Sequence, residues 1–260
     1  MLIRIFDFNV WDENPKSAGE IVDFIFSHDA HIVCLQEVRE DVLAEIQKRD
    51  RYLECAVAHD TRRTNGGLCF LVTLSRFPVI KRGVVRAKRK RGWRSIFSNW
   101  WHNITEHLES LRADVLIQQK RIKILNVHLE VGTGPKNRLQ QFRHILRYGI
   151  RRRIIKHAII AGDFNIYGQG WYERFVGWLW FGLRSRELFL DEREEFERLF
   201  KERGLKNIFR GETTFFAGGI GFQFDHIIVP HAIAERVSKI YVCEETCCSD
   251  HKPVVAEFNM

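Results

Sequence analysis

The chain has 260 residues, a formal net charge of +8 at pH 7 and 45% hydrophobic residues. A chain of this length can bury a large core, and its positive charge favours a partner that carries negative charge. The longest apolar stretch, residues 175–183, is about half as long as a membrane-spanning helix. We therefore exclude a transmembrane segment at this point.

Strand-like and helix-like stretches alternate along the chain. A strand begins at Leu2, and apolar residues at helical spacing predict further elements. The predicted helices span residues 15–26, 38–48, 137–150 and 192–203. Asp191 followed three positions later by Glu194 is typical of a capping box at a helix start, and Gly204 follows the helix end. The alternation predicts a layered α/β fold.

Four short motifs with acidic or histidine residues stand in a fixed order. They are Gln36-Glu37, Asn126-Val127-His128-Leu129, Gly162-Asp163-Phe164-Asn165 and Ser249-Asp250-His251-Lys252-Pro253. Apolar, strand-like runs over residues 30–35, 122–127 and 158–161 lead into the first three. Rigid strands aim the residues at their ends, so we expect these side chains to meet at a common sheet edge. Together they indicate one hydrolytic site.

The acidic residues suit a hard divalent cation. Glu37 and Asp250 offer oxygen ligands of the kind that Mg²⁺ or Mn²⁺ prefers, whereas Cys and His pairs at zinc spacing are nearly absent. A divalent ion screens phosphate charge and stabilises the transition state of phosphate ester hydrolysis. The sequence therefore predicts a metal-dependent phosphoesterase.

The remaining polar residues suit proton handling and phosphate contact. Asp163 and Asn165 stand two positions apart, so on an extended segment both side chains point the same way. One then orients water and the other donates to a phosphoryl oxygen. His128 and His251 suit the role of acid or cationic stabiliser.

This set resembles the endonuclease/exonuclease/phosphatase superfamily, which includes deoxyribonuclease I, exonuclease III, deadenylases, sphingomyelinases and inositol polyphosphate 5-phosphatases. The resemblance spans nearly the whole chain. Its further motifs are Asn9 in Phe6-Asp7-Phe8-Asn9, Asn65-Gly66-Gly67, Ser75-Arg76-Phe77-Pro78 and Asp225 in Phe224-Asp225-His226-Ile227. It implies a deoxyribonuclease I-like, four-layer α/β/β/α sandwich with two packed mixed sheets flanked by helices. Because motifs from Asn9 to His251 must converge on one site, we also expect one domain over residues 1–260.

The resemblance implies a role for each matching residue. Asn9, Glu37 and Asp250 would lie at the metal, Mg²⁺ or Mn²⁺. The implied catalytic residues are His128, Asp163, Asn165, Asp225 and His251. Among these, Asp163 would orient the attacking water, and Asp225 would be the hydrogen-bonded partner of His251. Asn65, in its Asn-Gly-Gly motif, joins the expected substrate-binding residues.

A basic and aromatic insertion at about residues 81–111 bears on substrate choice. It lies between strands expected at 67–73 and 113–118, with a helical segment expected over 95–111. Eight cations and four rings crowd it: Lys81, Arg82, Arg86, Lys88, Arg89, Lys90, Arg91 and Arg94, then Trp93, Phe97, Trp100 and Trp101. Three interpretations stay open: a solvated loop, a nucleic-acid groove, and an interfacial helix on anionic lipid. Arg89, Arg91 and Trp93 are the substrate-binding candidates here.

Two smaller features keep alternatives open. Aromatic residues crowd residues 171–181, either as packed core or as a flexible lip beside the site. Six cysteines occur without a pair at two-residue spacing, and we expect reduced thiols. Cys243, Cys247 and Cys248 stand next to Asp250, so a disulfide in that group stays open.

The sequence as a whole predicts a Mg²⁺- or Mn²⁺-dependent phosphodiesterase, with nucleic acid as first choice of substrate. A phospholipid or sphingomyelin-type phosphodiesterase at an anionic membrane surface is the alternative, and a catalytically inactive binding module is a remote one. Because the His128 motif differs from that of abasic endonucleases, abasic-site repair is disfavoured. The residues around Asp225 lack the inositol phosphatase signature. We expect a cytoplasmic protein without signal peptide, and no protein partner is inferable.

Overall fold

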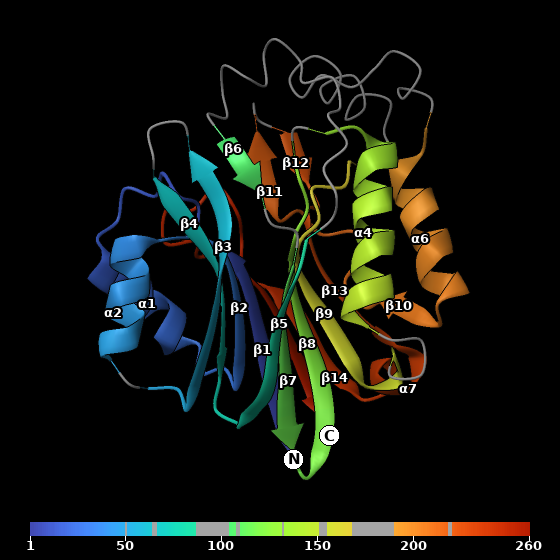
Figure 1. The fold of residues 1–260 in the computed structure, drawn as a ribbon, viewed down its shortest axis with the longest axis horizontal. Helices are drawn as coiled ribbons and strands as arrows, with labels where there is room; N and C mark the ends of the chain where they lie inside the picture. The colour runs from blue at the N-terminus through green and yellow to red at the C-terminus, as the bar shows by residue number, and fades with distance from the viewer. Residues whose placement is uncertain are drawn as a thin grey trace.

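The computed structural model describes residues 1–49, 51–63, 67–86, 104–107, 110–131, 133–150, 155–167, 190–217 and 220–260. In these residues two mixed β-sheets pack face to face, and helices cover the outer face of each (Figure 1). The four-layer α/β/β/α sandwich predicted from the sequence is confirmed.

The first sheet joins the two ends of the chain. Across the described residues its seven strands lie in the order β14 (Val237–Val242), β15 (Val254–Asn259), β1 (Leu2–Asn9), β2 (Ile32–Arg39), β4 (Leu68–Ser75), β3 (Glu54–Arg63) and β6 (Ile104–His107). β1 pairs parallel with β2 and antiparallel with β15. The N-terminal strand is therefore central in its sheet, with motif residues at its end.

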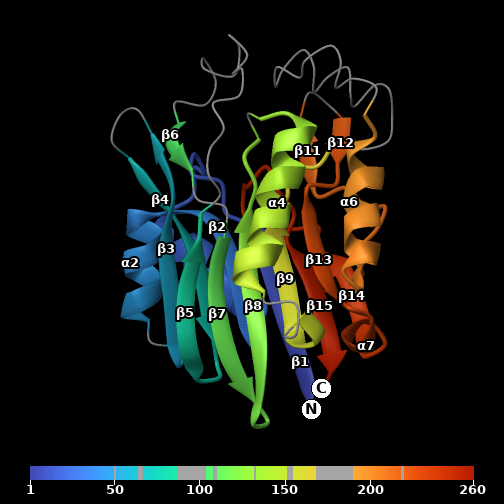
Figure 2. The same ribbon diagram turned by 45° about the vertical axis from the view of Figure 1, so that its right-hand side comes forward.

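The second sheet carries the other motifs. Its six described strands lie in the order β10 (Leu205–Asn207), β13 (Asp225–Pro230), β9 (Ala158–Asp163), β8 (Lys120–His128), β7 (Ser110–Ile117) and β5 (Val79–Val85). β8 and β9 run parallel, which brings their C-terminal ends to the same edge. A separate hairpin of β11 (Phe215–Ala217) and β12 (Ile220–Phe222) stands beside that edge (Figure 2).

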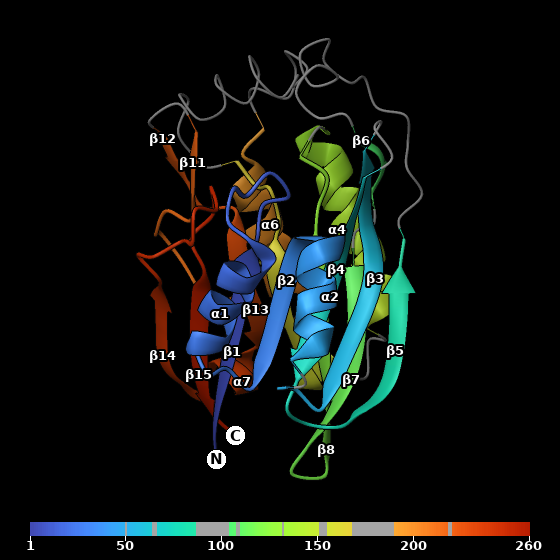
Figure 3. The same cartoon turned by 90° about the vertical axis from the view of Figure 1, so that its left-hand side faces the viewer.

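Helices cover both outer faces because each presents one apolar side. α1 (Ala18–Ser27) and α2 (Glu40–Lys48) cover the first sheet (Figure 3). α4 (Pro135–Gly149) and α6 (Glu192–Glu202) cover the second. Two short helices, η1 (Ile155–His157) and α7 (His231–Ala234), lie at the end of the sandwich where β9 begins and β13 ends. No described helix is long and apolar enough to cross a membrane.

The helix boundaries refine the sequence predictions. α1 begins at Ala18 rather than residue 15, because Ser17 caps it: its hydroxyl accepts from the backbone N–H of Glu20, whose carboxylate accepts from the Ser17 N–H. α2 begins at Glu40, since Val38 is still part of β2 and pairs with Phe70. The predicted cap of α6 is present, with the Asp191 side chain accepting from Glu194 N–H.

The insertion is narrower than its predicted bounds of 81–111. Residues 81–85 belong to β5 and pair with β7, which already begins at Ser110. The part of the expected 95–111 helix that the structure describes includes a strand, β6, so the helical prediction is wrong there. Residues 87–103, with most of the predicted cations and rings, lie outside the described residues, as does the 171–181 aromatic cluster. All six cysteines are free.

Candidate active site

The motif residues meet at one edge of the sandwich, the upper edge in Figure 1. Asn9, His128 and Asp163 end strands β1, β8 and β9, while Asp225 begins the antiparallel β13 opposite Asp163. Parallel strands deliver their C-terminal residues to the same edge, as their apolar runs predicted. His251 lies in the β14–β15 connection, which is fastened to β1 because the Ser249 hydroxyl donates to the Asn9 carbonyl at 2.7 Å.

One carboxylate oxygen lies at the centre of the cluster. Oδ2 of Asp163 accepts a hydrogen bond from Nδ2 of Asn9 at 3.0 Å. The Nε2 atoms of His128 and His251 lie 3.8 and 3.7 Å from that oxygen. All four residues are buried, so the charged groups among them interact strongly. Side chains from β1, β8, β9 and the C-terminal loop thus surround a single acidic group.

Each histidine is backed by its own carboxylate. Nδ1 of His251 lies 2.8 Å from Oδ2 of Asp225, and Nδ1 of His128 lies 2.7 Å from Oδ2 of Asp60. A carboxylate accepts from Nδ1–H, so this contact fixes the ring and turns Nε2 toward Asp163. The His251–Asp225 pairing was predicted from the sequence. Asp60, on β3, was not.

Burial and the neighbouring carboxylates oppose each other in setting the histidine pKa values. Burial alone would lower the pKa of His128, but the adjacent Asp60, with Asp163 and Glu37, raises it to about 10. His251 follows the same logic: burial lowers its pKa, whereas Asp225 and Asp163 raise it well above its usual value. The neighbouring carboxylates thus favour the protonated form of both imidazoles, which flank Asp163.

Glu37 reaches the cluster from an irregularity in β2. The β2–β4 pairing slips between Leu35 and Val38, and Glu37 has a positive φ of 55°. Such a bulge re-aims a side chain out of the strand alternation. Its Oε1 accepts from Nδ2 of Asn9 at 3.2 Å, and its backbone N–H donates to Asp60 Oδ2 at 3.2 Å. Asp60 thereby holds both Glu37 and His128.

Asp250 supplies a partly buried carboxylate without a full set of partners. Its Oδ1 has no hydrogen-bond partner among the described residues. Burial raises the pKa of Asp250 to about 6, His251 opposes that rise, and Glu37 adds to it. An unpaired buried anion oxygen near a second carboxylate is costly unless a cation is bound. The donor set of Asn9, Glu37 and Asp250, all oxygen or amide groups, therefore fits a hard divalent ion.

A second carboxylate and histidine group overlaps this set. Ligand atoms of Asp163, Asp225 and His251 all lie within 4.8 Å of one another. In this group, however, Nδ1 of His251 is already engaged by Asp225. Nε2 of His251, 3.7 Å from Asp163 Oδ2, is the nitrogen that this group offers to a cation.

Asn165 differs from the expected geometry. The sequence interpretation placed Asp163 and Asn165 on one extended segment with side chains pointing the same way. In the structure β9 ends at Asp163, and Asn165 adopts the left-handed conformation with φ of 51°, which asparagine tolerates. Its backbone N–H donates to Asp163 Oδ1 at 2.9 Å, and its side-chain amide donates to the Leu129 carbonyl at 2.9 Å. The expected parallel orientation is therefore wrong.

Two motif residues without an assigned role join the sheets beneath the site. The side-chain amide of Asn126, on β8, donates to the carbonyls of Leu35 and Val72 in the other sheet, at 2.9 and 3.0 Å. Its Oδ1 accepts from Gln36 Nε2 at 2.8 Å, and the same amide of Gln36 donates to Asp7 Oδ1. All of these groups are fully buried. The contacts tie the strand that ends at His128 to the bulge that carries Glu37.

An aromatic cluster borders the His251 side of the site. The ring of Phe215, on β11, lies 4.8 Å from the ring of His251 and stacks on Phe224. Tyr167 and Phe222 complete the cluster. The only sequence signal for it was the Phe222-Gln223-Phe224 alternation before Asp225, which reads as an ordinary strand. The predicted substrate-binding residues Asn65, Arg89, Arg91 and Trp93 lie outside the described residues.

Comparison with solved structures supports the fold. An endonuclease/exonuclease/phosphatase from Beutenbergia cavernae superposes with a TM-score of 0.73 at 16% identity, covering 100% of this chain and 72% of that one. A 3′ phosphatase from Neisseria, bound to a product DNA hairpin, gives 0.66 at 20% identity over 99% and 100%. An AP endonuclease from Archaeoglobus fulgidus gives 0.66 at 17% over 99% and 100%.

Sequence comparison gives the family. No curated protein matches the chain significantly. The profile of the endonuclease/exonuclease/phosphatase family, however, matches residues 8–251, a range that runs from just before Asn9 to His251. With its sandwich of two sheets and its carboxylate and histidine cluster, the chain belongs to the endonuclease/exonuclease/phosphatase family.

Proposed function

We propose that this chain is a divalent-metal-dependent phosphodiesterase that hydrolyses phosphate esters in nucleic acid. The observation that carries the proposal is the position of Asp163 Oδ2 between the Nε2 atoms of His128 and His251, each of which is held by its own carboxylate. A buried carboxylate flanked by two cationic imidazoles suits the attack of water on an anionic ester.

The chain's own residues divide the work. Asp163 orients the attacking water, since its Oδ2 lies near the Nε2 atoms of both histidines and is itself fixed by Asn9. His251 donates from Nε2 to a phosphoryl oxygen, with Asp225 holding its Nδ1. His128 faces the leaving oxygen in the same way, held by Asp60. Asn165, whose amide has a second hydrogen beside the one given to Leu129, contacts the phosphate.

Asn9, Glu37 and Asp250 are the proposed holders of Mg²⁺ or Mn²⁺. When bound, that ion screens the phosphate charge and stabilises the charge that develops in the transition state. The unpaired Oδ1 of Asp250 and its raised pKa support this assignment, because the cluster holds more negative charge than its hydrogen bonds satisfy. The metal identity rests on the preference of hard cations for oxygen ligands.

Charge supports nucleic acid as the substrate. The chain carries a net charge of +8, and cations that contact phosphates dominate nucleic-acid affinity. The Neisseria structure described above holds a DNA hairpin as product, in a protein of the same fold. For the proposed substrate contacts, Asn65, Arg89, Arg91 and Trp93 stay candidates from the sequence.

A substrate panel tests the proposal directly. The purified chain is assayed on single- and double-stranded DNA, RNA, sphingomyelin, phosphoinositides and a small aryl phosphodiester, with Mn²⁺ or Mg²⁺ and with chelator. We expect metal-dependent cleavage of nucleic acid and of the aryl ester. Asp163→Asn and His251→Ala are expected to lose most of kcat, while Asp23→Asn, which removes an exposed carboxylate paired with Arg49, keeps it.

Each alternative has its own outcome. Cleavage of sphingomyelin vesicles without cleavage of nucleic acid would replace the substrate assignment and keep the reaction type. Full activity in chelator would refute the metal-dependent mechanism. Salt-sensitive DNA binding with no turnover on any substrate would instead identify a binding module.

A further inference from the structure

A hollow opens at the end of the sandwich opposite to the candidate active site. It is bordered by the β7–β8 turn, η1, α7 and Met260, the residue that directly follows β15. The volume of the hollow is about 120 Å³. One ordered water needs only about 10–15 Å³ of such space, so the hollow has room for a small molecule. β8 runs from Lys120 at the hollow to His128 at the site, which separates the two by roughly 26 Å at about 3.3 Å per residue.

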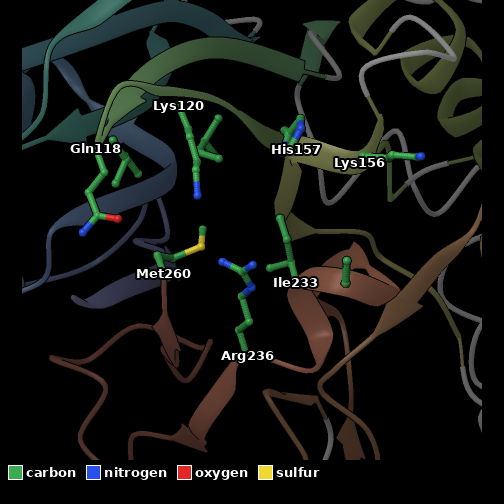
Figure 4. Close-up of a pocket in the computed structure, with 10 residues that line it drawn as sticks. Gln118, Lys120, Lys156, His157, Ile233, Arg236 and Met260 are labelled. Atoms are coloured by element: carbon green, nitrogen blue, oxygen red, sulfur yellow. The ribbon is translucent and has the colours of Figure 1, made fainter.

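The floor of the hollow is apolar. Ile117, Ile122 and Ile233 line it, and all three are buried members of the core between the two sheets. Met260 packs against the same core from the side (Figure 4). The inter-sheet core is thus reachable from outside at this end, and apolar atoms of a ligand would be removed from water here.

The rim of the hollow is positively charged. Lys120 and Arg236 enter from opposite sides, and their charged ends point toward the same space, with the His157 ring at the border (Figure 4). Neither cation has an ion pair or side-chain hydrogen bond with any described residue, and Lys156 extends away from the hollow (Figure 4). No Asp or Glu side chain is among the residues that line the hollow, and the terminal carboxylate of Met260 accepts from the Met1 ammonium at 3.1 Å. Lys120 and Arg236 therefore repel each other, and a bound anion would reduce that repulsion.

From this arrangement we propose a second ligand site, for a small organic anion with a phosphate or carboxylate head and a short apolar body. The head meets Lys120 and Arg236, and the body covers Ile117, Ile122, Ile233 and Met260. Arg236 suits such a head because its planar guanidinium binds phosphate or carboxylate through two parallel hydrogen bonds. This site is independent of the catalytic proposal, since it shares no residue with the candidate active site.

The apolar floor separates this proposal from a nucleic-acid contact. A phosphodiester backbone would bring negative charge and sugar to the rim, but no apolar body to cover the isoleucines and Met260. An amphipathic small anion satisfies both halves of the hollow at once. The two cases therefore differ in how binding responds to the apolar part of the ligand.

Methionine labelling gives a readout at the hollow itself. The chain has two methionines, Met1 and Met260, and only the second lines the hollow. With ¹³C-methyl methionine, the full chain is titrated in chelator with butyl phosphate, glycerol phosphate and inorganic phosphate, and a Met260→Leu variant assigns the signals. We expect a saturable shift of the Met260 methyl signal with butyl phosphate, at an affinity roughly tenfold above that for glycerol phosphate.

Charge-matched variants locate the head group. Lys120→Gln combined with Arg236→Gln is expected to weaken butyl phosphate binding by about tenfold or more. Lys48→Gln combined with Lys201→Gln removes two exposed cations from α2 and α6 and is expected to leave binding unchanged. No shift at millimolar butyl phosphate, or equal affinity in both double variants, would overturn the proposal. Equal binding of butyl and glycerol phosphate would also overturn it, as would a larger Met260 shift with a DNA oligonucleotide.

Discussion

Asp60 and His128 lie 68 residues apart in sequence and meet at 2.7 Å, with the carboxylate of the first on Nδ1 of the second. The same Asp60 oxygen accepts the backbone N–H of Glu37, so one acid on β3 fixes a proposed metal ligand and a proposed proton donor together. Because Asp60 is buried, nothing in solvent competes for these contacts. This makes Asp60 the point from which the His128 side of the site is organised.

Removing the charge of Asp60 should release His128. In the metal-free protein, burial lowers and Asp60 raises the pKa of His128, with a net result of about 10, so the ring stays protonated at neutral pH. In Asp60→Asn the raising influence is lost, and we expect His128 to titrate well below that value. Proton NMR of the ring measures this shift, and kcat on an aryl phosphodiester should fall roughly 10- to 100-fold.

Asp225→Asn is the matched control for that variant. It removes the carboxylate behind His251 and leaves the His128–Asp60 contact in place. We expect this variant to change the titration of the His251 ring signals and to leave the titration of the His128 signals unchanged. If Asp60→Asn leaves the titration of His128 unchanged, the assigned partnership is wrong.

Asn126 should contribute to stability as well as to site geometry. Asn126→Ala removes the donor to the Leu35 and Val72 carbonyls and the acceptor for Gln36, all inside the core. Buried groups left unpaired cost about 1–3 kcal/mol each, and this variant takes a partner from three of them, so we expect the free energy of unfolding to fall by about 3 kcal/mol or more. Urea denaturation measures it. Asn137→Ala, on α4, removes a partly buried contact to Thr133 and should cost less than about 1 kcal/mol.

Catalysis provides the second half of that test. Because Asn126 ties β8 to the β2 bulge, its loss should let His128 and Glu37 drift apart, and kcat should fall at temperatures where the variant is fully folded. A variant that is destabilised as expected but keeps wild-type kcat would show that Asn126 supports the fold without positioning the site.

The elements that carry the motifs could be predicted because their sequences are locally unambiguous. Residues 158–161 are all apolar, and residues 122–127 are apolar except for Lys123 and Asn126. Runs of this kind form buried parallel strands, as β8 and β9 do. The polar residue at the end of each run could then be placed at a sheet edge. Asp163 and His128 lie there, next to each other in the β8–β9 register.

Other parts of the site depend on contacts that no local pattern encodes. Asp60 sits within the irregular end of β3, with no motif around it, and its role follows only from its contacts with Glu37 on β2 and His128 on β8. The positive φ of Asn165 and the bulge at Glu37 are likewise set by neighbouring strands. Tertiary context overrides local propensity at such positions. The expected extended geometry at Asn165 failed for this reason.

The pKa of Asp250 links stability, pH and metal. Burial raises that pKa from 3.8 to about 6, so the folded chain holds a proton that the unfolded chain has released. Its contribution to stability is therefore full below about pH 4 and is lost as the pH rises through about 6, by at most about 3 kcal/mol. In chelator, the free energy of unfolding of Asp250→Asn should lose that dependence on pH relative to wild type.

A bound metal ion should oppose this loss of stability at higher pH. A cation held by the Asp250 carboxylate displaces the proton, so Mn²⁺ should stabilise wild type more at pH 7 than at pH 5 and should release protons near pH 6. Denaturation with and without Mn²⁺ measures the stabilisation. Titration calorimetry in two buffers of different ionisation enthalpy measures the proton release. Asp23→Asn serves as the surface control. If Asp250→Asn gains as much stability from Mn²⁺ as wild type, Asp250 is not a ligand.

Gly162 allows the close approach of β9 to β8 on which the position of Asp163 depends. It has a φ of 143°, and a Cβ added there would lie 1.9 Å from the Val127 carbonyl oxygen. Gly162→Ala should therefore push β9 away from β8, lower the free energy of unfolding by about 3 kcal/mol or more, and displace Asp163 with loss of kcat. Gly204→Ala is the control: its φ is also positive, at 67°, but no atom lies within 4 Å of the added Cβ. That variant should cost only about 1 kcal/mol and keep full activity. Equal stability of the two variants would show that the strand contact at Val127 yields easily, and that the backbone conformation alone accounts for glycine at position 162.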